Sequence, residues 1–195
     1  MIAAQILVLT AAISVAAAPL DAYPAASVFE EVRGLCSSLT AFDDTVSRAK
    51  SRGWQLTQPT KRSPLAKRVN DLTAMSKEGG AKIRSAVFRK VAAGETLHAF
   101  LYEERSKDSY SVGCQIYDID EARSIPRVEI ERLVGSPASG NDSFDSGNIM
   151  MSWRRNAPLG DSRFEYAYFP AGGFEVIFSG LSGIRFATET STKVH

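Results

Sequence analysis

The chain has 195 residues, of which 44% are hydrophobic and 23% are charged, and its formal net charge is +1. This length predicts a single domain that is large enough to bury a substantial core. The composition excludes a mainly disordered chain, because aromatic and β-branched residues occur along most of its length.

The N-terminal segment has the pattern of a secretory signal peptide. The first charged side chain is Asp21, and the residues before it are mainly apolar or small. Val15 and Ala17 fit the small-residue positions of a cleavage site, so we predict a signal peptide over 1–17 and one domain over 18–195. The alternative is an uncleaved membrane anchor, for which this alanine-rich run is only marginally long. The prediction places the protein in the periplasm or outside the cell.

Helices are predicted in the first part of the chain. Apolar residues recur at helical spacing over 25–52, where two helices follow each other and end at Gly53. Pro64 is a favourable first residue for another helix, which ends at Gly79 and Gly80. The domain therefore begins with two helices, and a third precedes the strands.

After these helices the hydrophobic period changes to two, which is typical of strands. The predicted elements are strands over 83–91, 97–104 and 110–118, a helix over 126–134, and strands over 149–155, 163–169 and 174–178, with 184–188 as a further candidate. The short turns favour antiparallel pairing, because parallel strands need a long crossover. We predict an α+β domain with two N-terminal helices, an antiparallel sheet of about six strands in a βββ-α-βββ order, and the helices on one face.

The sequence contains two cysteines, Cys36 and Cys114. Cys36 lies on the apolar face of the first predicted helix, and Cys114 lies in an alternating run of strand residues. An even number of cysteines in an exported protein indicates pairing, so we predict a disulfide that joins helix to sheet. The alternative is two buried free thiols. A redox-active pair is disfavoured, because the sequence has no Cys-x-x-Cys motif.

The N-terminal half carries a loose motif that runs from the first helix to the cysteine-bearing strand. Its residues are Phe29, Cys36, Phe42, Ala49, Gly53, Trp54 and Cys114. This motif resembles small exported alphaproteobacterial proteins of uncharacterised function. The resemblance supports the signal peptide and the disulfide, and it implies no activity.

The polar residues give no catalytic, cofactor or metal signature. His98 lies in a predicted strand without a nearby histidine or cysteine, and we interpret it as an ordinary strand residue. Ser47 and Lys50 match Ser-x-x-Lys, but the companion motifs of serine acyl-transfer enzymes are absent from the sequence. Glu103 and Glu104 are adjacent, so on a strand they point to opposite faces. We therefore predict no catalytic residue, no cofactor and no metal ion.

The most informative feature is a basic segment over 48–90. It holds twelve Lys and Arg residues against Asp71 and Glu78, a net charge of about +10 that the rest of the chain offsets. Eight of these cations are our candidate binding residues: Arg48, Lys61, Arg62, Lys67, Arg68, Lys82, Arg84 and Lys90. Alternatively, the cations pair with the protein's own acidic residues, the candidates being Glu103, Glu104, Asp118, Asp120 and Glu121.

These features lead to three functional hypotheses: a binding module, an enzyme and, only as a default, a structural or assembly factor. The first is an exported, disulfide-bonded binding module whose basic segment engages an anionic component of the cell envelope, either a lipid, a glycan or an acidic protein. Export argues against nucleic acid as the partner. The alternative is an envelope hydrolase without a recognisable motif, which would depend on Ser47 and Lys50 or on the two adjacent glutamates.

Overall fold

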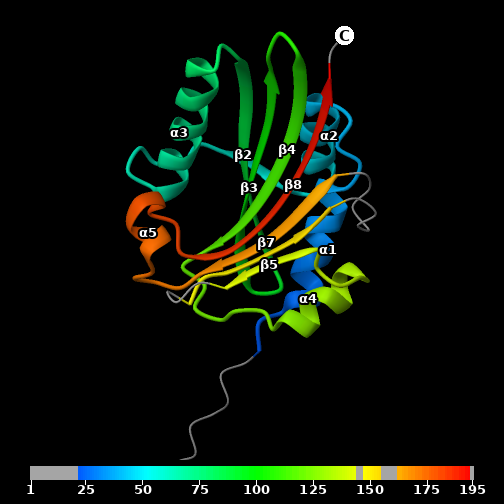
Figure 1. Cartoon of the computed structure of the whole chain (residues 1–195), viewed down its shortest axis with the longest axis vertical. Coiled ribbons are helices and arrows are strands. Elements are labelled where there is room, and N and C mark those ends of the chain that lie inside the picture. The colour runs from blue at the N-terminus through cyan, green and yellow to red at the C-terminus, as the bar shows by residue number, and fades with distance from the viewer. Residues whose placement is uncertain (1–21, 144–146, 155–161, 194–195) are drawn as a thin grey trace, which may run out of the picture.

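An eight-stranded antiparallel sheet organises the chain in our computed structural model, which describes residues 22–143, 147–154 and 162–193 (Figure 1). The strand order is β1-β2-β3-β4-β8-β7-β6-β5. The strands are β1 (Gln55–Thr57), β2 (Lys82–Ala92), β3 (Glu95–Arg105), β4 (Ser109–Ile119), β5 (Gly140–Ser143), β6 (Ile149–Trp153), β7 (Arg163–Phe169) and β8 (Gly183–Lys193). The predicted signal peptide, 1–17, lies outside the described residues.

The helices lie on both faces of this sheet. They are α1 (Ala25–Cys36), α2 (Phe42–Ser51), α3 (Pro64–Glu78), α4 (Arg127–Val134) and α5 (Phe174–Ser179). The first face packs against α1, α2 and α4, and the second face packs against α3, with α5 beside it (Figure 1). The prediction of helices on one face is therefore wrong. Strands β2, β3 and β4 carry apolar side chains on both faces, so both need cover.

None of the helices in the described part of the chain has the length and apolar character needed to cross a membrane.

The larger core lies between α1 and the first face of the sheet. α1 contributes a stripe at helical spacing, in which Val28, Val32 and Leu35 are fully buried. Phe29 on the same helix meets Phe164 of β7 edge to face, with ring centroids 5.8 Å apart. These contacts join the N-terminal helix to the C-terminal half of the sheet.

The disulfide joins Cys36, the last residue of α1, to Cys114 on β4. Both residues are fully buried, and their Cα atoms are 5.5 Å apart. The predicted link between helix and sheet is confirmed. It fixes the C-terminal end of α1 against the first face.

The second face carries a smaller core, which α3 covers only in part. α3 begins where the Ser63 side chain accepts a hydrogen bond of 3.1 Å from the Ala66 N–H. Leu65 then packs with Phe100 and Leu181. α3 lies over β2, and the part of the second face formed by β8 and β7 lies outside its cover (Figure 1).

Most predicted elements lie where the sequence indicates them, and the sheet is larger than predicted. Strands β1 and β5 are additions at its two edges, and 184–188 belongs to the longer strand β8. β1 has three residues and β5 has four, too few to show a hydrophobic alternation. Short edge strands also limit pairing with other chains.

The predicted strand over 174–178 is wrong, because this segment belongs to helix α5. β7 and β8 pair directly with each other, with Phe169 opposite Gly183. The segment between them therefore has no sheet edge to join and turns back as a short helix. Gly180 ends α5 in the left-handed conformation, with φ at 71°.

Candidate functional site

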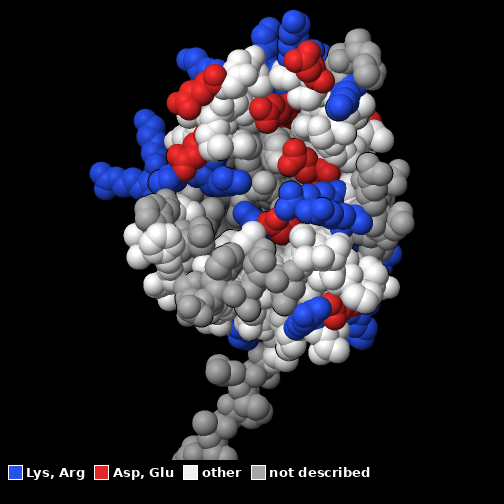
Figure 2. Space-filling model, in the orientation of Figure 1, with Lys and Arg blue, Asp and Glu red and all other residues white. Residues whose placement is uncertain are grey.

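A small polar pocket opens on the second face, beside α3. Its volume is about 150 Å³. The lining combines guanidinium, carboxylate, phenol and amide groups, contributed by Arg68, Tyr102, Gln115, Arg163, Glu165, Arg185, Ala187, Thr188 and Glu189. Figure 2 shows positive and negative side chains meeting around a hollow in the middle of this face. We call it the arginine pocket.

Strand register brings the sheet residues of the pocket together. Ala187 of β8 lies opposite Gln115 of β4 on one side and opposite Glu165 of β7 on the other. Side chains of a strand alternate between faces, so Arg185 and Glu189 share the second face with Ala187. Three neighbouring strands thus place one amide, two carboxylates and a guanidinium side by side.

Arg68 reaches the same pocket from α3. Leu65 and Val69, on the same side of this helix, pack onto the second core and hold it against the sheet. Arg68 is half-buried and lines the pocket together with Gln115 of β4. The pocket is therefore assembled from parts of the chain that are far apart in sequence.

Ion pairs hold the charged groups of the pocket in place. Arg185 pairs closely with Glu165, and the two side chains are only 18% and 15% exposed. Arg163 contacts the other oxygen of Glu165 at 3.4 Å and is itself 66% exposed. Three guanidinium groups face two carboxylates in the lining, so the pocket keeps an excess of positive charge.

Two phenols add polar groups at this site. The Tyr102 hydroxyl donates to Oε2 of Glu189 at 3.2 Å, and the Tyr117 hydroxyl donates to Oε1 of Gln115. Burial raises the pKa of both phenols, and the Glu189 carboxylate raises that of Tyr102 further. Both hydroxyls are therefore protonated at neutral pH.

Three buried side-chain atoms of the lining residues lack a hydrogen-bond partner among the described residues. They are Nε of Arg68, Nε of Arg185 and Oγ1 of Thr188. A buried donor without a hydrogen bond costs free energy, which a bound acceptor would recover. A planar guanidinium matches the oxygens of carboxylate and phosphate groups, so this arrangement can hold an anion.

Of the eight candidate binding residues, Arg68 is the one that lines the arginine pocket. The others are distributed over both faces of the sheet and its loops, so the basic segment does not form one continuous surface.

Two of these candidates on the first face pair with acidic residues of the protein itself. Arg84 contacts Asp43 at 2.7 Å and Glu103 at 3.1 Å, and Lys90 contacts Glu31 at 2.8 Å. Glu103 is one of the acidic residues predicted for this role, whereas Glu31 and Asp43 come from α1 and α2. Arg84 and Lys90 therefore follow the alternative prediction, in which the cations pair with acidic residues of the protein itself.

Arg48 has a structural role at the end of α1. Its guanidinium donates to the backbone carbonyls of Leu35, Ser37 and Ser38. Leu35 lies in the last turn of α1, and Ser37 and Ser38 follow it. Carbonyls at this end of a helix have no partner within the helix. Arg48 is therefore engaged with the backbone of its own domain.

The remaining candidates are exposed. Lys67 pairs with Asp71 one turn later on α3, at 2.6 Å. Lys61 and Arg62 lie in the loop that enters α3, and Lys82 is the first residue of β2. Exposed pairs and single surface cations contribute little to stability, so these residues are free to serve contacts with partners.

Arg163 and Arg185, the other arginines of the pocket, lie outside the basic segment and are not among the residues predicted to bind. Each precedes a buried aromatic residue on its strand, Phe164 or Phe186. That alternation reveals an arginine on the face opposite the larger core. It does not reveal that two strands and α3 bring these side chains to one place.

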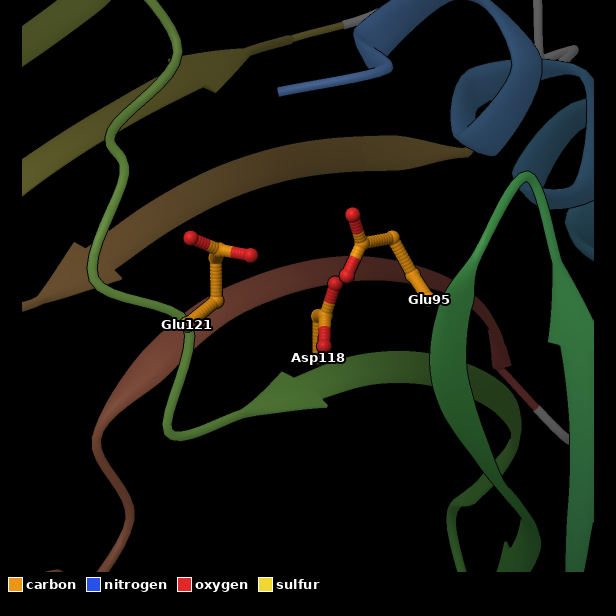
Figure 3. A group of neighbouring side chains, drawn as sticks. All are labelled: Glu95, Asp118 and Glu121. Atoms are coloured by element: carbon orange, nitrogen blue, oxygen red, sulfur yellow. The ribbon is translucent and has the colours of Figure 1, made fainter. Parts of the chain in front are cut away.

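A second polar cluster lies on the first face (Figure 3). The carboxylates of Glu95, Asp118 and Glu121 lie within 4.8 Å of one another, close enough to hold a metal ion. Arg123 already occupies this group, with contacts of 2.7 Å to Glu95 and 2.6 Å to Glu121. Tyr23 donates a hydrogen bond of 3.0 Å to Asp118. We interpret the cluster as an internal charge network.

The groups named for a hydrolase lie outside the arginine pocket. Ser47 and Lys50 are both exposed on α2. Glu103 and Glu104 are successive residues of β3 and so lie on opposite faces. His98 on β3 is half-buried, and burial followed by the charge of Arg89 lowers its pKa. None of these groups lines the arginine pocket.

Comparison of the chain with protein-family models, with curated proteins and with solved structures finds no match.

Proposed function

We propose that this chain is an exported binding module that holds the anionic group of a cell-envelope component in the arginine pocket. One observation carries the proposal: the guanidinium groups of Arg68, Arg163 and Arg185 line one pocket, and the buried Nε groups of Arg68 and Arg185 have no hydrogen-bond partner in the described part of the chain. Oxygens of a phosphate, sulfate or carboxylate group would supply the missing acceptors.

The acidic residues of the pocket narrow the ligand chemistry. The carboxylate oxygens of Glu165 and Glu189 accept hydrogen bonds and offer no donor to the oxygens of a bare polyanion, so they would repel it. They would favour a ligand with a neighbouring hydroxyl or ammonium group. A cavity of about 150 Å³ accommodates a single headgroup of that kind rather than a long segment of polymer. The proposed ligand is therefore a small anionic group that also carries a donor.

Export is part of this proposal. A buried disulfide suits an oxidising compartment outside the cytoplasm. The apolar N-terminal sequence and the resemblance to small exported alphaproteobacterial proteins point to the same compartment. Detection of the protein in the periplasm or the medium, with its N-terminus cut after Ala17, would test this part directly.

The binding itself is tested by thermal unfolding of the oxidised protein with phosphoserine, inorganic phosphate or sulfate. At one hundred times its Kd a ligand of the folded state stabilises the protein by about 2.7 kcal/mol. We expect phosphoserine to stabilise most, and the effect to fall with added salt. Arg68→Gln should weaken binding by at least about tenfold, because a charge-assisted hydrogen bond is lost.

Lys67→Gln is the matched control, because Lys67 is next to Arg68 on α3 and lies outside the pocket lining. It should leave the stabilisation by phosphoserine unchanged. The proposal is contradicted if no anion stabilises the protein, or if Arg68→Gln and Lys67→Gln weaken binding equally.

A further inference from the structure

Helix α5 presents two large apolar side chains to solvent. Phe174 is 62% exposed and Ile177 is 73% exposed. Residues three apart on a helix are neighbours on its surface, so the two side chains belong to one patch. We take this patch as a candidate contact site, because exposed apolar side chains that gather on a surface can mark one.

Exposed cations precede and follow the start of α3, where α5 packs against it. We call this contact between α3 and α5 the junction. α5 packs against the start of α3: a Cβ placed on Gly180 would be 3.6 Å from Pro64. Lys61 and Arg62 come directly before this start, and Lys67 lies in the following turn. Lys61 and Arg62 have no ion-pair partner within the described residues.

We propose that this junction is a contact surface for an anionic phospholipid bilayer. Phe174 and Ile177 would enter the boundary between headgroups and acyl chains, and Lys61 and Arg62 would bind the phosphate groups around them. Apolar insertion and attraction of cations to anionic lipids together account for binding of this kind. A protein partner would explain the apolar patch, but the adjacent unpaired cations favour a negatively charged surface.

This surface is separate from the arginine pocket, so either proposal can fail without the other. Phe174, Ile177, Lys61 and Arg62 are absent from the pocket lining. A bilayer at the junction would also lie beside the second face, on which the pocket opens (Figure 1).

Vesicle co-sedimentation tests the proposal. It uses the oxidised protein with the N-terminus that the producing cell leaves on it. One set of vesicles contains phosphatidylglycerol and phosphatidylcholine in equal parts, and the other contains phosphatidylcholine alone. We expect binding to the mixed vesicles that falls as salt is added. The pair Phe174→Ser with Ile177→Ser and the pair Lys61→Glu with Arg62→Glu should each weaken it by at least about tenfold.

Val128→Ser is the matched apolar control, because Val128 is 75% exposed on α4, which covers the first face. All variants share one N-terminus, so any contribution from that segment is the same in each. Equal melting temperatures establish that the variants are folded. The proposal is overturned if mixed vesicles bind no better than phosphatidylcholine, if neither pair weakens binding, or if Val128→Ser weakens it as much. Loss of phosphoserine binding in Arg68→Gln, with vesicle binding intact, would separate the pocket from the lipid surface.

Discussion

Asp118, at the end of β4, is a buried carboxylate whose surroundings disfavour its charge. Burial raises its pKa to about 6, and the charges of Glu95 and Glu121 act in the same direction. The hydrogen bond from Tyr23 and the charge of Arg123 act in the opposite direction. The folded chain therefore holds this proton more tightly than the unfolded chain does.

A pH dependence of stability follows from this shift. Between roughly pH 4 and pH 6, folded Asp118 keeps a proton that the unfolded chain has lost, so the free energy of unfolding falls as the pH rises through this window. Asp118→Asn removes that dependence. It should raise the free energy of unfolding at pH 7 by about 2 kcal/mol and change it little at pH 4. Urea denaturation of both proteins at each pH measures the difference.

Asp71→Asn serves as control, because Asp71 is an exposed residue that pairs with Lys67 on the surface of α3. That substitution should change stability only slightly at either pH. A destabilised Asp118→Asn protein at pH 7 would show that the ionised carboxylate supports the fold, contrary to this account.

The arginines show what a sequence can say about single residues. Composition identifies Arg48, Arg68 and Arg84 equally as cations of one basic segment. In the fold Arg48 binds the carbonyls at the end of α1, Arg84 pairs across the first face, and Arg68 lines the pocket. Each role depends on what another part of the chain places nearby, and no local pattern records that.

At the scale of elements, a side chain from α2 supports the connection between α1 and α2. α1 ends at Cys36, and Ser38 follows with a positive φ of 55°. Arg48, from the middle of α2, donates to three carbonyls in this turn. It thereby stabilises the turn and the C-terminal end of α1, where a positive charge is favourable.

Arg48→Met should lower the free energy of unfolding by about 1 to 3 kcal/mol, because carbonyls that are partly buried lose charged donors. Arg48→Lys should recover only part of this loss, since an ammonium lacks the planar fork. Lys50→Met on the exposed side of α2 is the control and should be nearly neutral. Urea denaturation of the three variants tests the account, and equal stability of Arg48→Met and Lys50→Met would refute it.

At the scale of the whole molecule, α1 is the element that connects distant parts of the chain. Its apolar stripe packs on the sheet, and Phe29 reaches Phe164 on β7. Cys36 adds a covalent link to Cys114, 78 residues later. The first face therefore combines a packed helix with a closed loop that includes α2, α3, β2 and β3.

Removal of the disulfide by Cys36→Ala with Cys114→Ala should lower the free energy of unfolding by about 2 to 5 kcal/mol. The cause is that the unfolded chain gains conformational freedom when no disulfide joins two residues that are 78 positions apart. Reduction of the native protein should produce a comparable loss, whereas a reductant should not affect the double variant. Thermal and urea unfolding measure both. A loss well below 1 kcal/mol would mean that packing alone fixes α1.

Local patterns in the sequence are sufficient to predict the class of fold, the helices before the strands, most of the antiparallel strands and the disulfide. These features depend on local period and composition: a stripe at helical spacing ending in Cys36, alternation around Cys114, and glycines that stop the helices. Hydrophobic periodicity has a direct physical cause, because each element must turn its apolar side chains toward a core.

The other features of the fold and the pocket depend on contacts between distant parts of the chain. The segment 174–178 is helical because β7 and β8 already pair with each other, although its residues suit a strand. α3 covers the second face because both faces of the central strands are apolar. The arginine pocket exists because strand register and α3 bring Arg68, Arg163 and Arg185 together. These outcomes depend on the spatial neighbours of each residue, which packing of the whole chain determines.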